Sequence, residues 1–389
     1  MRIKTSKKTK VISARDFLWF IILICYLESP YLSRFQFMDI LYTVGKLFSV
    51  GFILLPIKKI RFNLVMVVII LLETALWIST LRAGTPLGSV SKQVISVTAF
   101  IFIIDIMLKE DAKRCIRVLY IIMELLIYTN VVSMLLFPNG LYHPLAVAGT
   151  KKYYFLGHQN AMGLYSTIAI VLGEFRLQVD EDENYKFRRL IFLEAVSIFY
   201  VIRVWSVTSL LSVTCIIIIN FYNRISKKGW RVSLAWSLVL NVLIFILVVL
   251  MQNLYFFSSF LQTVLRREVT LSGRTRLWSR AFSVFLQEPV WGVGQGQGNE
   301  IFGFATTHNR YMNTLFTGGI VGIVLFAILL ILICKKLNNT KENVTRILIS
   351  YFTVLLIIIQ GETFDDILFY LMFVVACNIQ CLRRTKKEK

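Results

Sequence analysis

Residues 271–322 read LSGRTRLWSRAFSVFLQEPVWGVGQGQGNEIFGFATTHNRYMNTLFTGGIVG, the one long polar interruption in a chain built otherwise of apolar runs. Many of those runs reach about 20 residues, the length that crosses the hydrocarbon core of a bilayer. Of the 389 residues, 57% are hydrophobic, and the mean hydropathy is +0.68. Such a chain is too apolar for a soluble protein. The sequence therefore predicts an all-α polytopic membrane protein whose functional residues lie in this interruption.

Windows of about 20 residues predict about twelve transmembrane helices. They lie near residues 17–33, 38–56, 62–81, 91–108, 116–137, 160–178, 190–203, 206–222, 232–251, 309–334, 346–361 and 364–382. The longest polar gap is too short for a soluble domain with its own core. We therefore expect a single membrane domain, 1–389, that contains one large extracytoplasmic loop at 252–308.

The net charge of +21 is mainly a topology signal, because the basic residues are concentrated in alternate loops. Thirty of the 43 Lys and Arg residues fall on one predicted side, which makes both termini cytoplasmic and puts 252–308 outside. No nucleic-acid partner is expected. The six cysteines lie in or at the cytoplasmic ends of the predicted spans, so no disulfide framework is predicted.

The first half of the polar stretch has the pattern of an amphipathic helix. One predicted face holds Leu277, Trp278, Ala281, Val284 and Phe285, and the other holds Arg276, Ser279, Arg280 and Ser283. Ser272 suits the N-cap, and Glu288-Pro289 should end the helix because the residue before proline avoids the helical conformation.

Two arginines stand in the first turn of this predicted helix. Arg274 and Arg276 add positive charge to a helix end that is already partly positive, which favours a bound anion such as phosphate. Phosphates of membrane lipids are one possible anion and a substrate is the other. We prefer a substrate, because His308 follows on the same predicted side of the membrane.

All three histidines, His143, His158 and His308, fall on the predicted outer side. A three-histidine metal site is not favoured, because no HxH or HxxxH spacing is present. His143 precedes a proline and suits a turn. For His158, an interfacial hydrogen bond and a contact to substrate are equally consistent with its place at a span entrance. We expect no metal and no cofactor.

Two further patterns leave alternatives open. The glycines of 292–298 lack the strand-to-helix context of a nucleotide loop, and we expect a flexible link that lets the amphipathic helix approach His308. Ionisable residues within the predicted spans should face the bundle interior, where they form ion pairs or a conduction path. They are Lys46, Glu73, Asp105, Glu124 and Glu194. The conduction path keeps a transporter possible.

The stretch resembles the O-antigen ligase and polymerase family of bacterial envelope glycosyltransferases, which includes the Wzy-type polymerases. The matching positions are Ser272-Gly273-Arg274, Trp278, Pro289, Gly292 to Gly296, His308 to Tyr311, Leu315 and Gly318 to Gly322. Gly157 to Gly163, GHQNAMG, is a weaker echo of the family's Gly-x-x-Asn element. The expected Ser-Arg doublet at the eighth span is replaced here by Arg203 and a following Trp205-Ser206.

This resemblance implies an inverting, metal-independent glycosyl transfer at the outer face of a bacterial cytoplasmic (inner) membrane, in capsule, exopolysaccharide or O-antigen synthesis. The implied partners are polyprenyl-diphosphate-linked oligosaccharides, membrane lipid, a flippase and a chain-length regulator. A polysaccharide polymerase is the first hypothesis, and an O-antigen ligase-type transferase shares nearly all its chemistry. A lipid-linked oligosaccharide flippase is the second alternative, although the two halves of the chain lack the similarity that inverted repeats would give.

Residue roles follow from this chemistry. A diphosphate leaving group needs cations that grip phosphate in a bidentate manner, as arginine does. Arg274 and Arg276 are the first candidates, and Arg280 and Arg310 are weaker ones. The attacking hydroxyl needs a base near neutrality, and an imidazole, with an ordinary pKa of about 6.5, suits this role. We expect His308 to be that base.

Three more residues complete the predicted site. Asn309, next to His308, can orient an imidazole or a sugar. His158 and Arg203 are predicted to contact substrate from the fifth and seventh interspan boundaries.

Overall fold

The computed structural model describes residues 13–54, 62–143, 152–179, 183–226, 233–251, 274–303, 305–338, 342–364 and 366–382. Within these ranges most residues are helical and the paired strands form one short hairpin, which confirms the predicted all-α class. The predicted N-cap Ser272 and residues 252–271 of the predicted outer loop lie outside the described ranges.

The elements follow the apolar runs of the sequence. The helices are α1 (Ala14–Tyr26), η1 (Leu32–Arg34), α2 (Gln36–Leu54), α3 (Leu64–Arg82), α4 (Gly88–Leu136), α5 (Met162–Val179), α6 (Glu183–Val204), α7 (Val207–Ile225), α8 (Leu234–Ile244), the π-helical η3 (Phe245–Leu250), α10 (Arg274–Gln287), α11 (Gly298–Phe302), α12 (Arg310–Asn338), α13 (Asn343–Ile358) and α14 (Asp366–Cys377). Strands β1 (Tyr153–Tyr154) and β2 (Gly157–His158) pair antiparallel.

Each of the twelve predicted spans coincides with a helical segment. The predicted runs 91–108 and 116–137 are two halves of α4, which is interrupted at Asp111 (φ −153°, ψ 89°). Among the described residues, α3, α4, α7 and α12 are long and apolar enough to cross a membrane, and 234–250, 343–358 and 366–377 are shorter apolar helices. The protein is thus a multi-pass membrane protein, and the count of twelve crossings stays a prediction.

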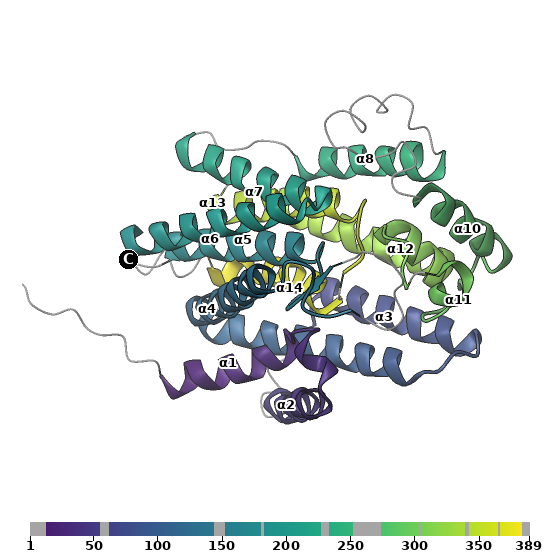
Figure 1. Ribbon diagram of the computed structural model, residues 1–389, viewed down its shortest axis with the longest axis horizontal. Coiled ribbons are helices and arrows are strands. Elements are labelled where there is room, and N and C mark those ends of the chain that lie inside the picture. Colours follow the sequence, from purple (N-terminus) through teal and green to yellow (C-terminus); the bar gives the residue numbers. More distant parts are fainter. Residues whose placement is uncertain are drawn as a thin grey trace, which may run out of the picture.

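Most of the helices lie side by side in one bundle, with α2 seen end-on at its edge and α10 and α11 at one end (Figure 1). Helix α3 packs against α12, α4 against α5 and α14, and α13 against α5, α7 and α8. Contacts between connecting segments gather at the same end as α10, including Ser29 Oγ to Phe155 O (2.5 Å) and the backbone N–H of Arg310 to Ile359 O (2.8 Å).

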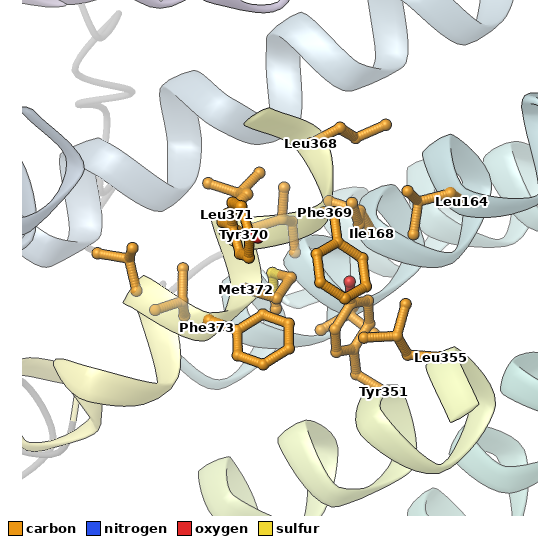
Figure 2. Packing of buried hydrophobic residues seen from close by; sticks show 14 of the residues in the cluster. Leu164, Ile168, Tyr351, Leu355, Leu368, Phe369, Tyr370, Leu371, Met372 and Phe373 are labelled. Carbon is orange, nitrogen blue, oxygen red and sulfur yellow. The ribbon is translucent and has the colours of Figure 1, made fainter. Parts of the chain in front are cut away.

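Helix α14 forms the centre of the bundle. Every residue of 367–377 is buried, so this helix has no lipid-facing side among the described residues. Its Phe369 and Phe373 side chains point toward Tyr351 and Leu355 of α13 (Figure 2). The Phe369 and Phe373 rings lie 5.2 Å apart between centroids. An apolar helix enclosed on all sides holds the two loops beside it in fixed positions.

Helix α12 is broken at Gly319, whose φ of 59° and ψ of −154° belong to a region that essentially only glycine occupies. The segment after α10 docks into this break through backbone hydrogen bonds, from Val293 N–H to Phe316 O (3.0 Å) and from Ile320 N–H to Pro289 O (2.8 Å). Ser79 Oγ of α3 adds a bond to Trp291 O (2.5 Å). The expectation of a flexible glycine link is therefore wrong for 290–294: these glycines permit close docking of backbone.

The five ionisable residues predicted within spans all have polar partners. Lys46 Nζ lies 3.3 Å from Glu28, and Lys109 Nζ donates to Asp105 at 2.5 Å. The other pairs are Glu124 with Arg189, Glu194 with Arg224, and Glu73 with Gln93 and Tyr370. Each of the five carries a compensating contact, which favours the ion-pair interpretation over a conduction path.

Candidate functional site

A buried carboxylate, Glu362, stands where three distant parts of the chain meet. It lies between α13 and α14 with 5% of its surface exposed. Asn160 Nδ2 donates to its Oε1 at 2.6 Å, and Arg274 Nη2 donates to the same oxygen at 3.1 Å. His308 Nδ1 lies 3.4 Å from Oε2. The carboxylate thus joins the predicted arginine and the predicted base.

Arg274 is placed by the helix that it begins. The predicted apolar face of α10 is confirmed, since Leu277, Trp278, Ala281 and Phe285 are buried and the helix ends at Gln287, before Glu288-Pro289. Trp278 Nε1 donates to Thr307 O (3.0 Å), which ties α10 to the segment that precedes His308. A second bond, from Arg274 Nη1 to Gly361 O (2.6 Å), fixes the guanidinium beside Glu362.

The other two arginines of α10 are exposed. Arg276 and Arg280 lie on the exposed face of α10, with Ser279 and Ser283. Their predicted contact with a diphosphate stays a prediction. Of the three arginines of this helix, Arg274 is the one that the structure brings to Glu362.

His308 has a left-handed backbone, with φ of 53°, which is uncommon for a residue other than glycine. Its neighbours hold it there: Thr307 Oγ1 donates to Asn309 O (3.0 Å), and the backbone N–H of Arg310 donates to Ile359 O (2.8 Å). Backbone strain of this kind persists where surrounding contacts fix the conformation, and it is frequent at functional sites. The strained turn directs the imidazole to Glu362.

Asn309 has a structural position. Its side chain is fully buried, its Nδ2 donates to Gln360 O (3.0 Å), and its Oδ1 accepts the backbone N–H of Met312 (2.9 Å). It therefore caps α12 and binds it to the segment that carries Glu362. Asn309 is thus buried next to His308 in the sequence. The predicted contact of Asn309 with substrate stays a prediction.

Arg310 points into the bundle instead of toward Glu362. Its guanidinium pairs with Asp366 and lies 4.8 Å above the ring of Phe369. Gln93 Nε2 links Asp366 to Glu73, to which it donates at 3.0 Å. This buried network braces α3, α4, α12 and α14 next to the site, and the weaker candidacy of Arg310 for diphosphate stays a prediction.

His158 lies at the border of the site, whereas Arg203 lies near Tyr154. His158 Nδ1 accepts the backbone N–H of Asn160 at 3.3 Å, and Asn160 in turn binds Glu362. Arg203 is exposed at the end of α6. Burial raises the pKa of Tyr154, and the positive charge of Arg203 opposes part of that rise. The next helix reaches the site as well, since Ser209 Oγ of α7 donates to Asn160 O (2.9 Å).

The charge state of Glu362 follows from these neighbours. Burial raises the pKa of its carboxyl most, yet the hydrogen bond of His308 and the positive charges of Arg274, His308 and His158 together lower that pKa below 4.5. Glu362 is therefore an anion at neutral pH. A carboxylate held in this way can orient the His308 ring.

Sequence reasoning missed Glu362 and the anchoring role of Asn160. Asn160 lies within the GHQNAMG element, but nothing local indicates that its partner is 202 residues away. The available signal for Glu362 was the sequence Gly361 to Asp366, GETFDD, an acidic group between two apolar runs on the predicted outer side. A buried acid needs a cation, and the outer arginines were the candidates.

Part of this site lies within a segment that matches a known protein family. Residues 190–327 match the O-antigen ligase family, Wzy_C. The match confirms the resemblance drawn from the sequence. The O-antigen ligase segment runs from α6 into α12 and carries Arg274 and His308, whereas Asn160 and Glu362 lie outside it. No curated protein matches the chain. Residues 190–327 are thus similar to the O-antigen ligase family, within a chain whose long apolar helices are those of a multi-pass membrane protein.

Proposed function

We propose that the protein is a polysaccharide polymerase, which transfers a polyprenyl-diphosphate-linked glycan onto a lipid-linked repeat unit at the outer face of a bacterial cytoplasmic membrane. The observation that carries this proposal is the meeting of Arg274 and His308 on the Glu362 carboxylate. A fixed cation beside an oriented imidazole supplies what a diphosphate leaving group and an attacking hydroxyl require.

The proposed step is a single displacement. The acceptor hydroxyl oxygen bonds to the anomeric carbon of the donor while the bond from that carbon to the diphosphate oxygen breaks. The hydroxyl proton passes to Nε2 of His308, because Nδ1 faces Glu362. The electron pair leaves with the lipid diphosphate. Attack opposite the leaving group inverts the anomeric centre.

The cations of the site have a defined task in this step. Arg274 stands at the N-terminus of the 14-residue α10, where backbone N–H groups and the helix dipole favour an anion. Two of its donors hold Gly361 O and Glu362, which fixes the direction of the guanidinium. Fixed cations of this kind neutralise the departing diphosphate, so the proposed reaction is metal-independent.

The first prediction concerns Arg274→Lys. Lysine keeps the charge but loses the planar fork that binds Gly361 O and Glu362 together, so we expect a marked loss of transfer activity. The membrane-inserted amount should stay near that of the wild type. The matched control is Arg280→Lys on the exposed face of the same helix, for which a smaller effect is expected. Polymer formation by membranes that contain equal amounts of each variant measures this, and full activity of Arg274→Lys would remove Arg274 from the proposed mechanism.

A second prediction concerns the side of the membrane. In a chain without its native cysteines, Gly296→Cys should react with a membrane-impermeant thiol reagent in intact cells, because Gly296 lies at the end of the bundle that carries the site. Ser226→Cys, at the opposite end of α7, should react only after permeabilisation. The reverse pattern would put Glu362 on the cytoplasmic side and contradict the proposed outer-face reaction.

Deletion of the protein distinguishes the related functions. A polymerase deletion should accumulate lipid carrier that bears single repeat units. Accumulation of long chains on the carrier would instead favour a ligase, an alternative supported by the description of the matched family. Accumulation of repeat units confined to the cytoplasmic leaflet would favour a flippase.

A further inference from the structure

Four aromatic rings contact one another in a row beside the site. Tyr31 lies 5.6 Å from Tyr142, Tyr142 lies 5.5 Å from Tyr153, and Tyr153 lies 5.3 Å from the ring of His158, all between ring centroids. We call these four residues the tyrosine ladder. The rings come from three connections, those between α1 and α2, between α4 and β1, and within the β1–β2 hairpin.

The tyrosine ladder is partly open to solvent. Its four rings are half-buried, and the end at Tyr31 continues into Phe35, which is 51% exposed and lies 5.6 Å from Tyr31. The exposed Arg34 places its guanidinium 4.4 Å above the ring of Tyr142. The tyrosine ladder thus presents aromatic rings and the hydrogen-bond donors of the Arg34 guanidinium on one surface.

Backbone contacts fix this arrangement. Leu141 N–H donates to Tyr153 O (2.7 Å), and Tyr31 N–H donates to Phe155 O (3.4 Å). Lys152 Nζ donates to Pro138 O (2.8 Å). At Gly157, whose φ is +87°, a Cβ would lie 3.3 Å from Pro30 Cγ, so the two connections pack closely there. Rings held in this way lose little conformational freedom when a ligand binds.

The tyrosine ladder also leads to the site. His158, its last member, accepts the backbone N–H of Asn160, and the Asn160 side chain donates to Glu362. A molecule lying along the rings would therefore end at His158, and Asn160 connects His158 to the Glu362 carboxylate.

We propose that the tyrosine ladder binds sugar units of the glycan that is transferred at Glu362. The two faces of a pyranose carry C–H groups that pack on aromatic rings, and its hydroxyl groups bind donors such as the Arg34 guanidinium. A row of rings matches a chain of sugars better than it matches one small molecule. This inference rests on the proposed function, since it takes the lipid-linked glycan as the substrate, and it assigns to these loops the part of that substrate remote from the diphosphate.

Tyrosines also gather at membrane interfaces, where they contact lipid headgroups. In that role each tyrosine ring contacts lipid independently of the other rings. The tyrosine ladder differs, because its rings contact one another across three connections and end at the site. A glycan-binding role predicts that loss of one ring weakens oligosaccharide binding, whereas an interfacial role predicts no change.

The test uses the oligosaccharide released by mild acid from the lipid-linked repeat units that a deletion strain accumulates, labelled with a fluorophore at its reducing end. Binding is measured by fluorescence polarisation to the full chain in nanodiscs. We expect Tyr142→Ala and Tyr153→Ala each to bind about tenfold more weakly than the wild type, by analogy with loss of a stacking ring in other ligand sites. Tyr142→Phe, which keeps the ring, should bind like the wild type. The matched control is Phe37→Ala, which removes a 74% exposed aromatic ring of α2 outside the tyrosine ladder.

Each outcome bears on the proposal. Tyr142→Leu keeps an apolar side chain without a ring and replaces Tyr142→Ala if that variant is not recovered folded; wild-type affinity in this variant would overturn the proposal. So would absence of binding by the wild type, even with transfer activity intact. His308→Ala should bind the oligosaccharide normally, which separates this role from the transfer step. A deletion strain that accumulates no lipid-linked glycan would overturn the proposed function and this inference with it.

Discussion

Replacement of His308 with alanine is expected to lower turnover about 10²- to 10⁴-fold, the usual contribution of a positioned general base. The physical reason is that the acceptor hydroxyl would lose its proton acceptor while Arg274 still neutralises the diphosphate. Donor retention should therefore stay near that of the wild type. The measurement is a purified-enzyme assay with the lipid-diphosphate oligosaccharide, scored for polymer formed and for donor bound.

The control for this prediction is His143→Ala, because His143 is an exposed histidine in the connection between α4 and β1. It should retain normal turnover. Near-normal polymer from both His308→Ala and His308→Gln would exclude the base role. Loss of donor retention together with activity would make His308 a binding residue instead.

Substitution of Gly319 by alanine is expected to destabilise the protein by about 2–5 kcal/mol, the sum of about 1–2 for an unfavourable backbone conformation and about 1–3 for overpacking. A Cβ at this position would lie 2.5 Å from the carbonyl carbon of Val290 and 2.7 Å from Gly292 N. Both neighbours are backbone atoms and cannot turn aside as a side chain could. The measurements are membrane-inserted yield and thermal unfolding of the detergent-solubilised protein.

Gly296→Ala provides the matched control for the Gly319 prediction. Gly296 also has a positive φ, +93°, but nothing lies within 4 Å of a Cβ placed there. The difference between the two variants therefore isolates the cost of the close backbone approach. Equal stability of both would show that the segment from Pro289 to Gly294 does not dock tightly against α12.

Much of the fold could be predicted because hydrophobic periodicity is a local property. The apolar runs marked the helices, and the alternation of apolar and polar positions marked the buried face of α10 around Trp278. The break in α12 was missed for a physical reason. The Gly318-Gly319 pair lies within an apolar run, and such a run does not indicate whether its helix continues or breaks. The break is set by docking of the segment from Pro289 to Gly294, which is not part of the run.

The site was predictable only in part. Arg274 and His308 were found because each has a chemical signature in a polar stretch on the predicted outer side. Glu362 was missed because its role depends on contacts with Asn160, Arg274 and His308. No rule of sequence spacing predicts those contacts. Arg310 lies two residues after His308 in the sequence, yet its guanidinium turns into the bundle and pairs with Asp366.

The position of Glu362 late in the chain has a consequence for biogenesis. A ribosome makes Asn160, Arg274 and His308 before it makes the carboxylate that joins them, since Glu362 lies later in the sequence, in the helical hairpin of α13 and α14. Until that hairpin enters the membrane, the nascent protein holds two cationic or proton-accepting side chains without their shared counter-ion. The transfer activity proposed above should therefore be absent until the hairpin of α13 and α14 has entered the membrane.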